Sequence, residues 1–140
     1  AWIPIFGWAL WAGTAIMIDR RERKAAIRSI ERAGRTIRAG SSVLMFPEGT
    51  RTPAGELRPL KKGPFHLALH AGVPVLPVGV IGTGAILPKG GLCIRPGRVR
   101  IILGTPIPTE GRTNDEAGRR VLSDEVYDAL GQLMDERQRS

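Results

Sequence analysis

Apolar residues recur at helical spacing in the first third of the chain. Between residues 23 and 39, Ala26 and Ile27 are followed at intervals of three or four by Ile30, Ala33 and Ile37. This spacing gathers them on one face of an amphipathic helix. The pattern therefore predicts a helix over residues 23–39, and Gly40 suits its C-terminal end.

Two further helices are predicted by their boundary residues. Pro64 favours the first turn of a helix that runs to about residue 71, where Gly72 would stop it. Asn114 is a favourable N-cap for a last helix over residues 114–136. The stripe that this helix is expected to bury contains Ala117, Val121, Val126, Leu130, Leu133 and Met134.

Continuous apolar runs predict strands instead. They occur near residues 14–18, 42–46, 75–80 and 98–103. Short apolar runs bounded by turn residues are typical of buried strands. Strands that alternate with helices indicate an α/β fold, with a mostly parallel or mixed sheet flanked by helices. Pro74 and Pro77 favour an edge or bulged course for the third strand.

The first 18 residues carry no charge. Such a run reaches the lower length of a membrane span, but Pro4, Gly7 and Gly13 divide it into a short helical piece near residues 6–11 and the first strand. Three tryptophans in this stretch suit a membrane–water interface, although packing in a core explains them nearly as well: Trp2, Trp8 and Trp11. An interfacial contact with a membrane is the preferred interpretation.

Composition narrows the class of partner. A chain of 140 residues, 42% hydrophobic and 24% charged, is expected to form one domain. Its net charge of +8 favours anionic partners. Nucleic-acid binders usually interleave aromatic and basic residues, a pattern not seen here, so phosphate or membrane is favoured over nucleic acid. Cys93 is the only cysteine, which excludes an intramolecular disulfide and a cysteine-based metal cluster.

The strongest candidates for a substrate-binding site follow the apolar run at residues 43–46. Pro47 cannot join a strand ladder and Gly49 permits a positive φ, so the chain is expected to turn there, at the edge of the sheet. The turn would present Glu48, Thr50 and Arg51. Together they can accept a hydrogen bond from a substrate hydroxyl, donate to it and clamp an anion. A surface turn with a local Glu–Arg pair is the alternative.

Three other groups of polar residues are candidates for a site. Lys61 and Lys62 precede a predicted helix N-terminus, where two cations are unfavourable unless an anion lies between them; two surface lysines are the alternative. His66 and His70 would share a helix face, but no acidic or cysteine partner has matching spacing, so no metal site is expected. Residues 82–84 lack the other features of a phosphate-binding loop, including a following helix start.

Four blocks of sequence, in order, resemble the glycerophospholipid acyltransferase family, specifically 1-acylglycerol-3-phosphate acyltransferases. They are Gly13–Arg20, Phe46–Arg51, Lys61–Gly63 and Val73–Val78, and the resemblance covers roughly residues 1–110. It implies a glycerol-3-phosphate acyltransferase-like fold. The substrate-binding residues that it implies are Arg20, Glu48, Gly49, Thr50, Arg51, Lys61 and Lys62. It also places Val75, Leu76 and Pro77 near an acyl-binding tunnel, whereas plain core packing is the alternative for these three.

The resemblance implies an enzyme of phospholipid biosynthesis. It would transfer an acyl chain from coenzyme A or acyl-carrier protein to the free hydroxyl of lysophosphatidate and form phosphatidate, with no metal or organic cofactor. The implied partners are the lysophospholipid acceptor, the acyl donor and a membrane surface, at its cytoplasmic face. For Arg20, the alternative is a solvated charge at the start of a basic helix.

One element of the family pattern is absent. Relatives carry a His followed five positions later by an Asp, upstream of the blocks seen here, as their general base. Five positions after His66 and His70 stand Ala71 and Val75, so neither histidine fits. We therefore expect residues 1–140 to be a single acyltransferase domain, incomplete at its N-terminal side, that alone catalyses little or nothing. A non-catalytic basic module that binds anionic phospholipid is the alternative, and a nucleic-acid binder is a weaker one.

Overall fold

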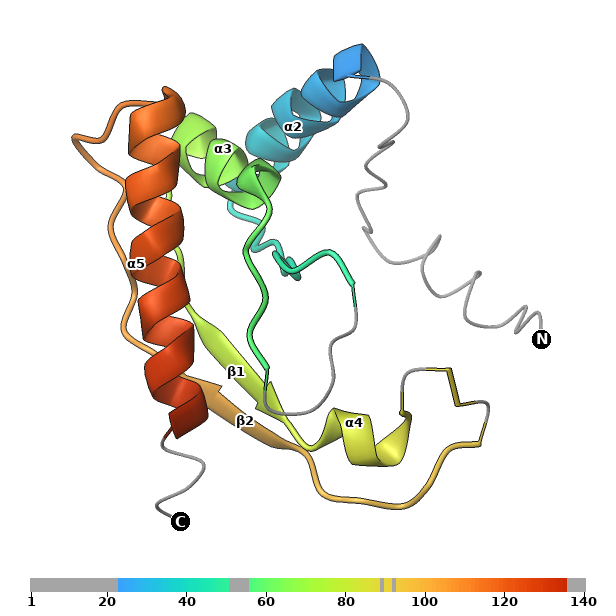
Figure 1. Ribbon diagram of the computed structural model, residues 1–140. Helices are drawn as coiled ribbons and strands as arrows, with labels where there is room; N and C mark the ends of the chain where they lie inside the picture. The colour runs from blue at the N-terminus through green and yellow to red at the C-terminus, as the bar shows by residue number, and fades with distance from the viewer. Residues whose placement is uncertain (1–22, 51–55, 89, 92, 136–140) are drawn as a thin grey trace.

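The computed structural model (Figure 1) describes the chain in four stretches, residues 23–50, 56–88, 90–91 and 93–135. The helical piece expected near residues 6–11, the strand expected near residues 14–18 and the three tryptophans lie outside these stretches. In chain order the elements are α2 (Arg23–Arg38), α3 (Lys62–Ala71), β1 (Val78–Ile81), α4 (Thr83–Ile86), β2 (Arg100–Leu103) and α5 (Glu116–Asp135). Among the described helices, none is both long and apolar enough to cross a bilayer.

Helix α3 lies between α2 and α5 and packs on both (Figure 1). Its Phe65 and Ala68 are buried in one cluster with Leu122 and Val126 of α5. Its Leu67 is buried in a second cluster with Ile30 and Ala33 of α2. A ten-residue helix thus contributes to two parts of the core, which fixes the position of its N-terminus relative to both neighbours.

Helices α2 and α3 end at glycines, as predicted. Gly40 has φ +97° and its N–H donates to the carbonyl of Ile37 at 2.9 Å. Gly72 has φ +68° and its N–H donates to the carbonyl of Ala68 at 2.9 Å. Since residues with a Cβ rarely adopt this left-handed conformation, glycine is the residue that lets the chain leave each helix.

The prediction for α5 was correct in extent but not in detail. Its N-cap is Asp115, whose carboxylate accepts a 2.7 Å hydrogen bond from the N–H of Gly118, and not Asn114. Val126 and Leu133 are buried as predicted, but Val121 is 49% exposed and Leu122 is fully buried. A helix advances 100° per residue, so the neighbouring apolar positions 121 and 122 cannot both face the core. Ala117 is also exposed.

The described strands form a two-stranded antiparallel sheet, with Val78 opposite Leu103 and Ile81 opposite Arg100. Strand β2 lies within the predicted run at 98–103, and β1 overlaps the run at 75–80 but ends one residue beyond it. Both strands are shorter than predicted, and a single bridge between Val75 and Ile107 continues the pairing. The α/β class is confirmed. The predicted sheet was mostly parallel or mixed, whereas the pairing between these two strands is antiparallel.

The predicted strand at 42–46 is not a strand in the structure. Leu44 and Phe46 are 76% and 71% exposed, while Met45 packs against the α2–α3 cluster. The segment joins no described sheet, and an apolar run by itself does not specify a ladder partner. A short helix, α4, was also not predicted. It begins after Gly82, where φ is +97° and a Cβ would collide with the carbonyl of Arg98.

Candidate functional site

A tight turn carries the first candidate residues. The N–H of Gly49 donates to the carbonyl of Phe46 at 3.1 Å, which closes a four-residue turn with Pro47 in second place. Gly49 has φ +72°, as predicted, and no described residue other than glycine has a positive φ, so Glu48 takes an ordinary conformation. Proline second and glycine fourth are the preferences of a type I turn. The local sequence therefore determines how Glu48 is presented.

A pocket of about 450 Å³ lies beside this turn. Its lining consists of Glu48, Gly49, Thr50, Arg58, Pro59 and Lys61. The backbone N–H of Lys61 donates to the carbonyl of Pro47 at 2.8 Å, which joins the start of α3 to the turn. Four of the residues predicted to bind substrate, Glu48, Gly49, Thr50 and Lys61, thus meet at one pocket.

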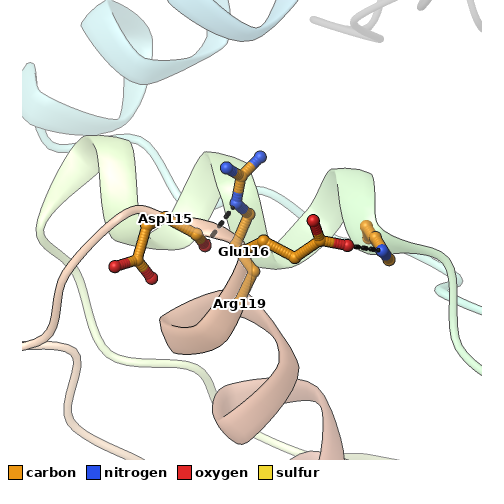
Figure 2. Close-up of polar contacts among 4 residues, drawn as sticks. Asp115, Glu116 and Arg119 are labelled. Atoms are coloured by element: carbon orange, nitrogen blue, oxygen red, sulfur yellow. Dashed lines mark hydrogen bonds and ion pairs between the residues drawn. The ribbon is translucent and has the colours of Figure 1, made fainter.

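The two adjacent lysines have different surroundings. Lys61 lines the pocket, whereas Nζ of Lys62 lies 2.6 Å from Oε1 of Glu116 at the start of α5 (Figure 2). Both side chains of this ion pair are largely exposed, at 70% and 80%. The hydrogen bond from Lys62 lowers the pKa of the Glu116 carboxyl. Of the two predicted lysines, the structure brings Lys61 to the pocket and directs Lys62 to α5.

Some predicted residues cannot be placed, and one pocket residue was missed. Arg20 and Arg51 lie outside the described stretches. Arg58 lines the pocket but belongs to none of the four sequence blocks. The one signal that could have identified it is its position on the same loop as Lys61, three residues earlier.

The start of α3 adds positive potential to the pocket. Its N-cap is Lys61, whose backbone is extended, and no side chain caps the helix there. The first turn of α3 also contains no acidic residue. Helix N-termini carry partial positive charge on their unpaired N–H groups. With Arg58 and Lys61 on the lining and Glu48 as its one carboxylate, the described part of the pocket is suited to an anion that also bears a hydroxyl.

Helix α5 contacts the segment that leads into the pocket residue Arg58. The hydroxyl of Tyr127 donates to the carbonyl of Leu57, the residue before Arg58, at 3.4 Å. Nearby, Arg112 donates two hydrogen bonds to the carboxylate of Glu125, at 2.8 and 2.9 Å. This bidentate pair raises the pKa of Arg112 and lowers that of Glu125. It fastens the loop before α5 to the helix.

The three tunnel candidates differ in burial. Pro77 is buried, Val75 is partly buried against the α3–α5 cluster, and Leu76 is 45% exposed. Val75 also exchanges two backbone hydrogen bonds with Ile107, at 2.9 and 2.8 Å. These contacts give Val75 and Pro77 a role in the core, and the acyl tunnel stays a prediction.

The two histidines lie between helices. Their ring centroids are 6.4 Å apart in an edge-on arrangement. Burial lowers the pKa of His66, and the positive charges of Arg119 and His70 lower it further. Arg119 leaves α5 on the side of α3 (Figure 2). No group of three His, Cys, Asp or Glu side chains that could hold a metal ion is found in the part of the chain that the structure covers.

Comparisons with known proteins agree on one family. The sequence model described as Acyltransferase matches residues 1–81. A chloroplastic 1-acyl-sn-glycerol-3-phosphate acyltransferase of Brassica napus is 40% identical over 106 residues, which cover 75% of this chain and 31% of that protein. A 1-acyl-sn-glycerol-3-phosphate acyltransferase of Pseudomonas aeruginosa is 38% identical over 111 residues, 79% of this chain and 43% of that protein.

A solved structure also matches. The crystal structure of the 1-acyl-sn-glycerophosphate acyltransferase of Thermotoga maritima superimposes with a TM-score of 0.78 at 29% identity. The match covers 97% of this chain and 52% of that one. The chain therefore spans about half the length of the Thermotoga maritima protein, and smaller shares of the Brassica napus and Pseudomonas aeruginosa proteins.

Proposed function

The chain belongs to the acyltransferase family, and we propose that it forms the acceptor-binding part of an enzyme that acylates 1-acylglycerol-3-phosphate. The observation that carries the proposal is the pocket that joins the Pro47–Gly49 turn to the start of α3. It combines cations, a carboxylate and a hydroxyl within one small volume. A glycerol phosphate with a free hydroxyl presents the complementary groups.

Four of the lining residues have a proposed part in binding the acceptor. Lys61 and the N-terminus of α3 bind the phosphate, since both present N–H groups and positive potential to an anion. Glu48 accepts a hydrogen bond from the glycerol backbone, Thr50 adds a hydroxyl, and Gly49 lets the chain approach closely. By resemblance to the family, Arg20 and Arg51 contribute to the same anion site. The ion pair with Glu116 argues against a direct role for Lys62.

The proposed reaction is an ordinary acyl transfer. The acceptor hydroxyl oxygen attacks the thioester carbonyl of acyl-coenzyme A or acyl-carrier protein, its proton passes to a general base, and the thiol leaves. The pocket would orient the acceptor hydroxyl for this attack. No metal or organic cofactor is required. The acceptor and product are lipids, so the proposed setting is the cytoplasmic face of a membrane.

The general base is proposed to come from outside residues 1–140. Neither His66 nor His70 has the Asp partner of the family pattern, and His70 is exposed on α3. Residues 1–140 alone are therefore expected to bind the acceptor and to transfer acyl groups slowly or not at all.

The test compares residues 1–140 with a chain extended upstream. Transfer to lysophosphatidate is measured in detergent, from a long-chain acyl-coenzyme A and separately from acyl-carrier protein. Activity of the extended chain that is lost in Glu48→Ala would support the proposal. Equal activity of the two chains would refute the missing base. If the extended chain is inert with both donors but binds anionic vesicles regardless of Glu48→Ala, the non-catalytic lipid-binding module becomes the better account.

A further inference from the structure

We propose that Arg58 determines headgroup specificity, by selecting acceptors that carry a terminal phosphate monoester over acceptors whose phosphate is a diester. The proposal rests on the function proposed above and assigns a role to a residue outside the four sequence blocks. Arg58 lines the pocket together with Lys61, and these are the two cations of its described lining.

Both ends of the segment that carries Arg58 are held in place. At one end the carbonyl of Leu57 accepts the 3.4 Å hydrogen bond from Tyr127 of α5. At the other, the N–H of Lys61 donates to the carbonyl of Pro47 at 2.8 Å. Pro59 fixes one further backbone angle between them. A guanidinium on a restrained segment loses less conformational freedom when it binds a ligand.

Arg58 forms no ion pair with another described residue, although the carboxylate of Glu48 lines the same pocket. The ion pairs found among the described residues join Lys62 to Glu116 and Arg112 to Glu125. Of the cations around the start of α3, Lys62 is therefore already paired, whereas Arg58 lines the pocket without an ion-pair partner in the part that the structure covers. An incoming anion can become that partner.

The number of free oxygens and the charge of a monoester suit two cations better than those of a diester do. The planar fork of a guanidinium donates two parallel hydrogen bonds to two oxygens of one phosphate. A phosphate monoester offers three non-bridging oxygens and a charge between about −1.5 and −2 at neutral pH. A diester has one fewer free oxygen and a single negative charge. If one of these two oxygens contacts Lys61, only one is left for Arg58, and the guanidinium cannot bind two further free oxygens. The pair Arg58 and Lys61 therefore matches the monoester.

The test measures ligand binding, so it needs no catalytic base. Residues 1–140 are titrated calorimetrically with glycerol 3-phosphate, a monoester, and with glycerophosphoglycerol, a diester. The variants are Arg58→Gln and Arg58→Lys. Arg95→Gln is the matched control, because Arg95 is an exposed arginine outside the pocket lining. Circular dichroism verifies that each variant is folded.

We expect Arg58→Gln to weaken binding of the monoester roughly tenfold or more, as the loss of a charge-assisted hydrogen bond does, and to change diester binding only about twofold. Arg58→Lys should lie between, because it keeps the charge but not the fork. Equal weakening of both ligands, or no change, would overturn the proposal while leaving the proposed function intact. Failure of the unsubstituted chain to bind either ligand would overturn both.

Discussion

Substitution of the two adjacent lysines by alanine should affect phosphate binding to very different extents. Lys61 lines the pocket, while Lys62 is held 2.6 Å from Glu116 on α5. We predict that Lys61→Ala weakens binding of glycerol 3-phosphate strongly and that Lys62→Ala does not. The substitutions remove the same side chain at consecutive positions, so a difference reports the geometry and not the total charge.

The magnitude follows from the site. A unit charge pair 4 Å apart is worth about 1 kcal/mol in water and about 4 kcal/mol at the effective dielectric of a protein surface. Lys61 is exposed, so the lower half of this range applies, and the value of a charge-assisted hydrogen bond, about 1.5–3 kcal/mol, overlaps it. Loss of Lys61 should therefore raise Kd roughly 10- to 100-fold. For Lys62, whose charge is already balanced by Glu116, we expect about a twofold change at 0.1 M salt.

Isothermal titration calorimetry at two salt concentrations measures both effects. The double variant Lys62→Ala with Glu116→Gln is the control, because it removes the ion pair while leaving the net charge unchanged. It should bind like the unsubstituted chain. A larger loss for Lys62→Ala than for Lys61→Ala would refute the assignment of the two lysines, since Lys62 would then contact the anion directly.

Two further predictions concern the scaffold. Leu122→Ala should lower the free energy of unfolding by about 2–5 kcal/mol because Leu122 is fully buried, while Val121→Ala, at a position 49% exposed, should change it by about 0.5 kcal/mol; urea denaturation measures both. The ion pair with Arg112 lowers the pKa of Glu125 in the folded protein. The pair therefore contributes its full stabilisation of the fold above the ordinary glutamate pKa of about 4.3, and this contribution is lost as the pH falls through the lower folded-state pKa. Glu125→Gln should therefore lower the thermal midpoint slightly at pH 7 but not at a pH below that folded-state value, and an equal loss at both pH values would contradict this origin.

The helices could be predicted because their signals are local. A period of three to four apolar positions identified α2, and glycines at 40 and 72 identified two helix ends. The face of α5 that is buried could not be predicted from sequence, because Val121 and Leu122 are both apolar and only packing against α3 determines which of them is buried. The strand predicted at 42–46 was wrong for a related reason. Apolar character predicts burial, but it does not supply a neighbouring strand to pair with.

In the candidate site, too, features set by local sequence could be predicted and features set by long-range contacts could not. Pro47 and Gly49 determine a turn by their own backbone preferences, so the turn that presents Glu48 was predicted from sequence, whereas the strand and sheet edge expected beside it are not found among the described residues. The separation of the lysines was not predicted, because Lys62 is directed by Glu116, which lies 54 residues away in the chain. Arg58 had no local signature either. Its place on the pocket depends on long-range contacts, such as the one between Leu57 and Tyr127 across 70 residues.

The measurement that tests the central claim most directly is a titration of isotopically labelled chain with glycerol 3-phosphate, followed by amide chemical shifts. We predict saturable shifts confined to the pocket, at Gly49, Thr50, Arg58 and Lys61, with none on the exposed basic loop around Arg95. Shifts spread over that loop, or no shifts at millimolar ligand, would contradict an acceptor site at the start of α3.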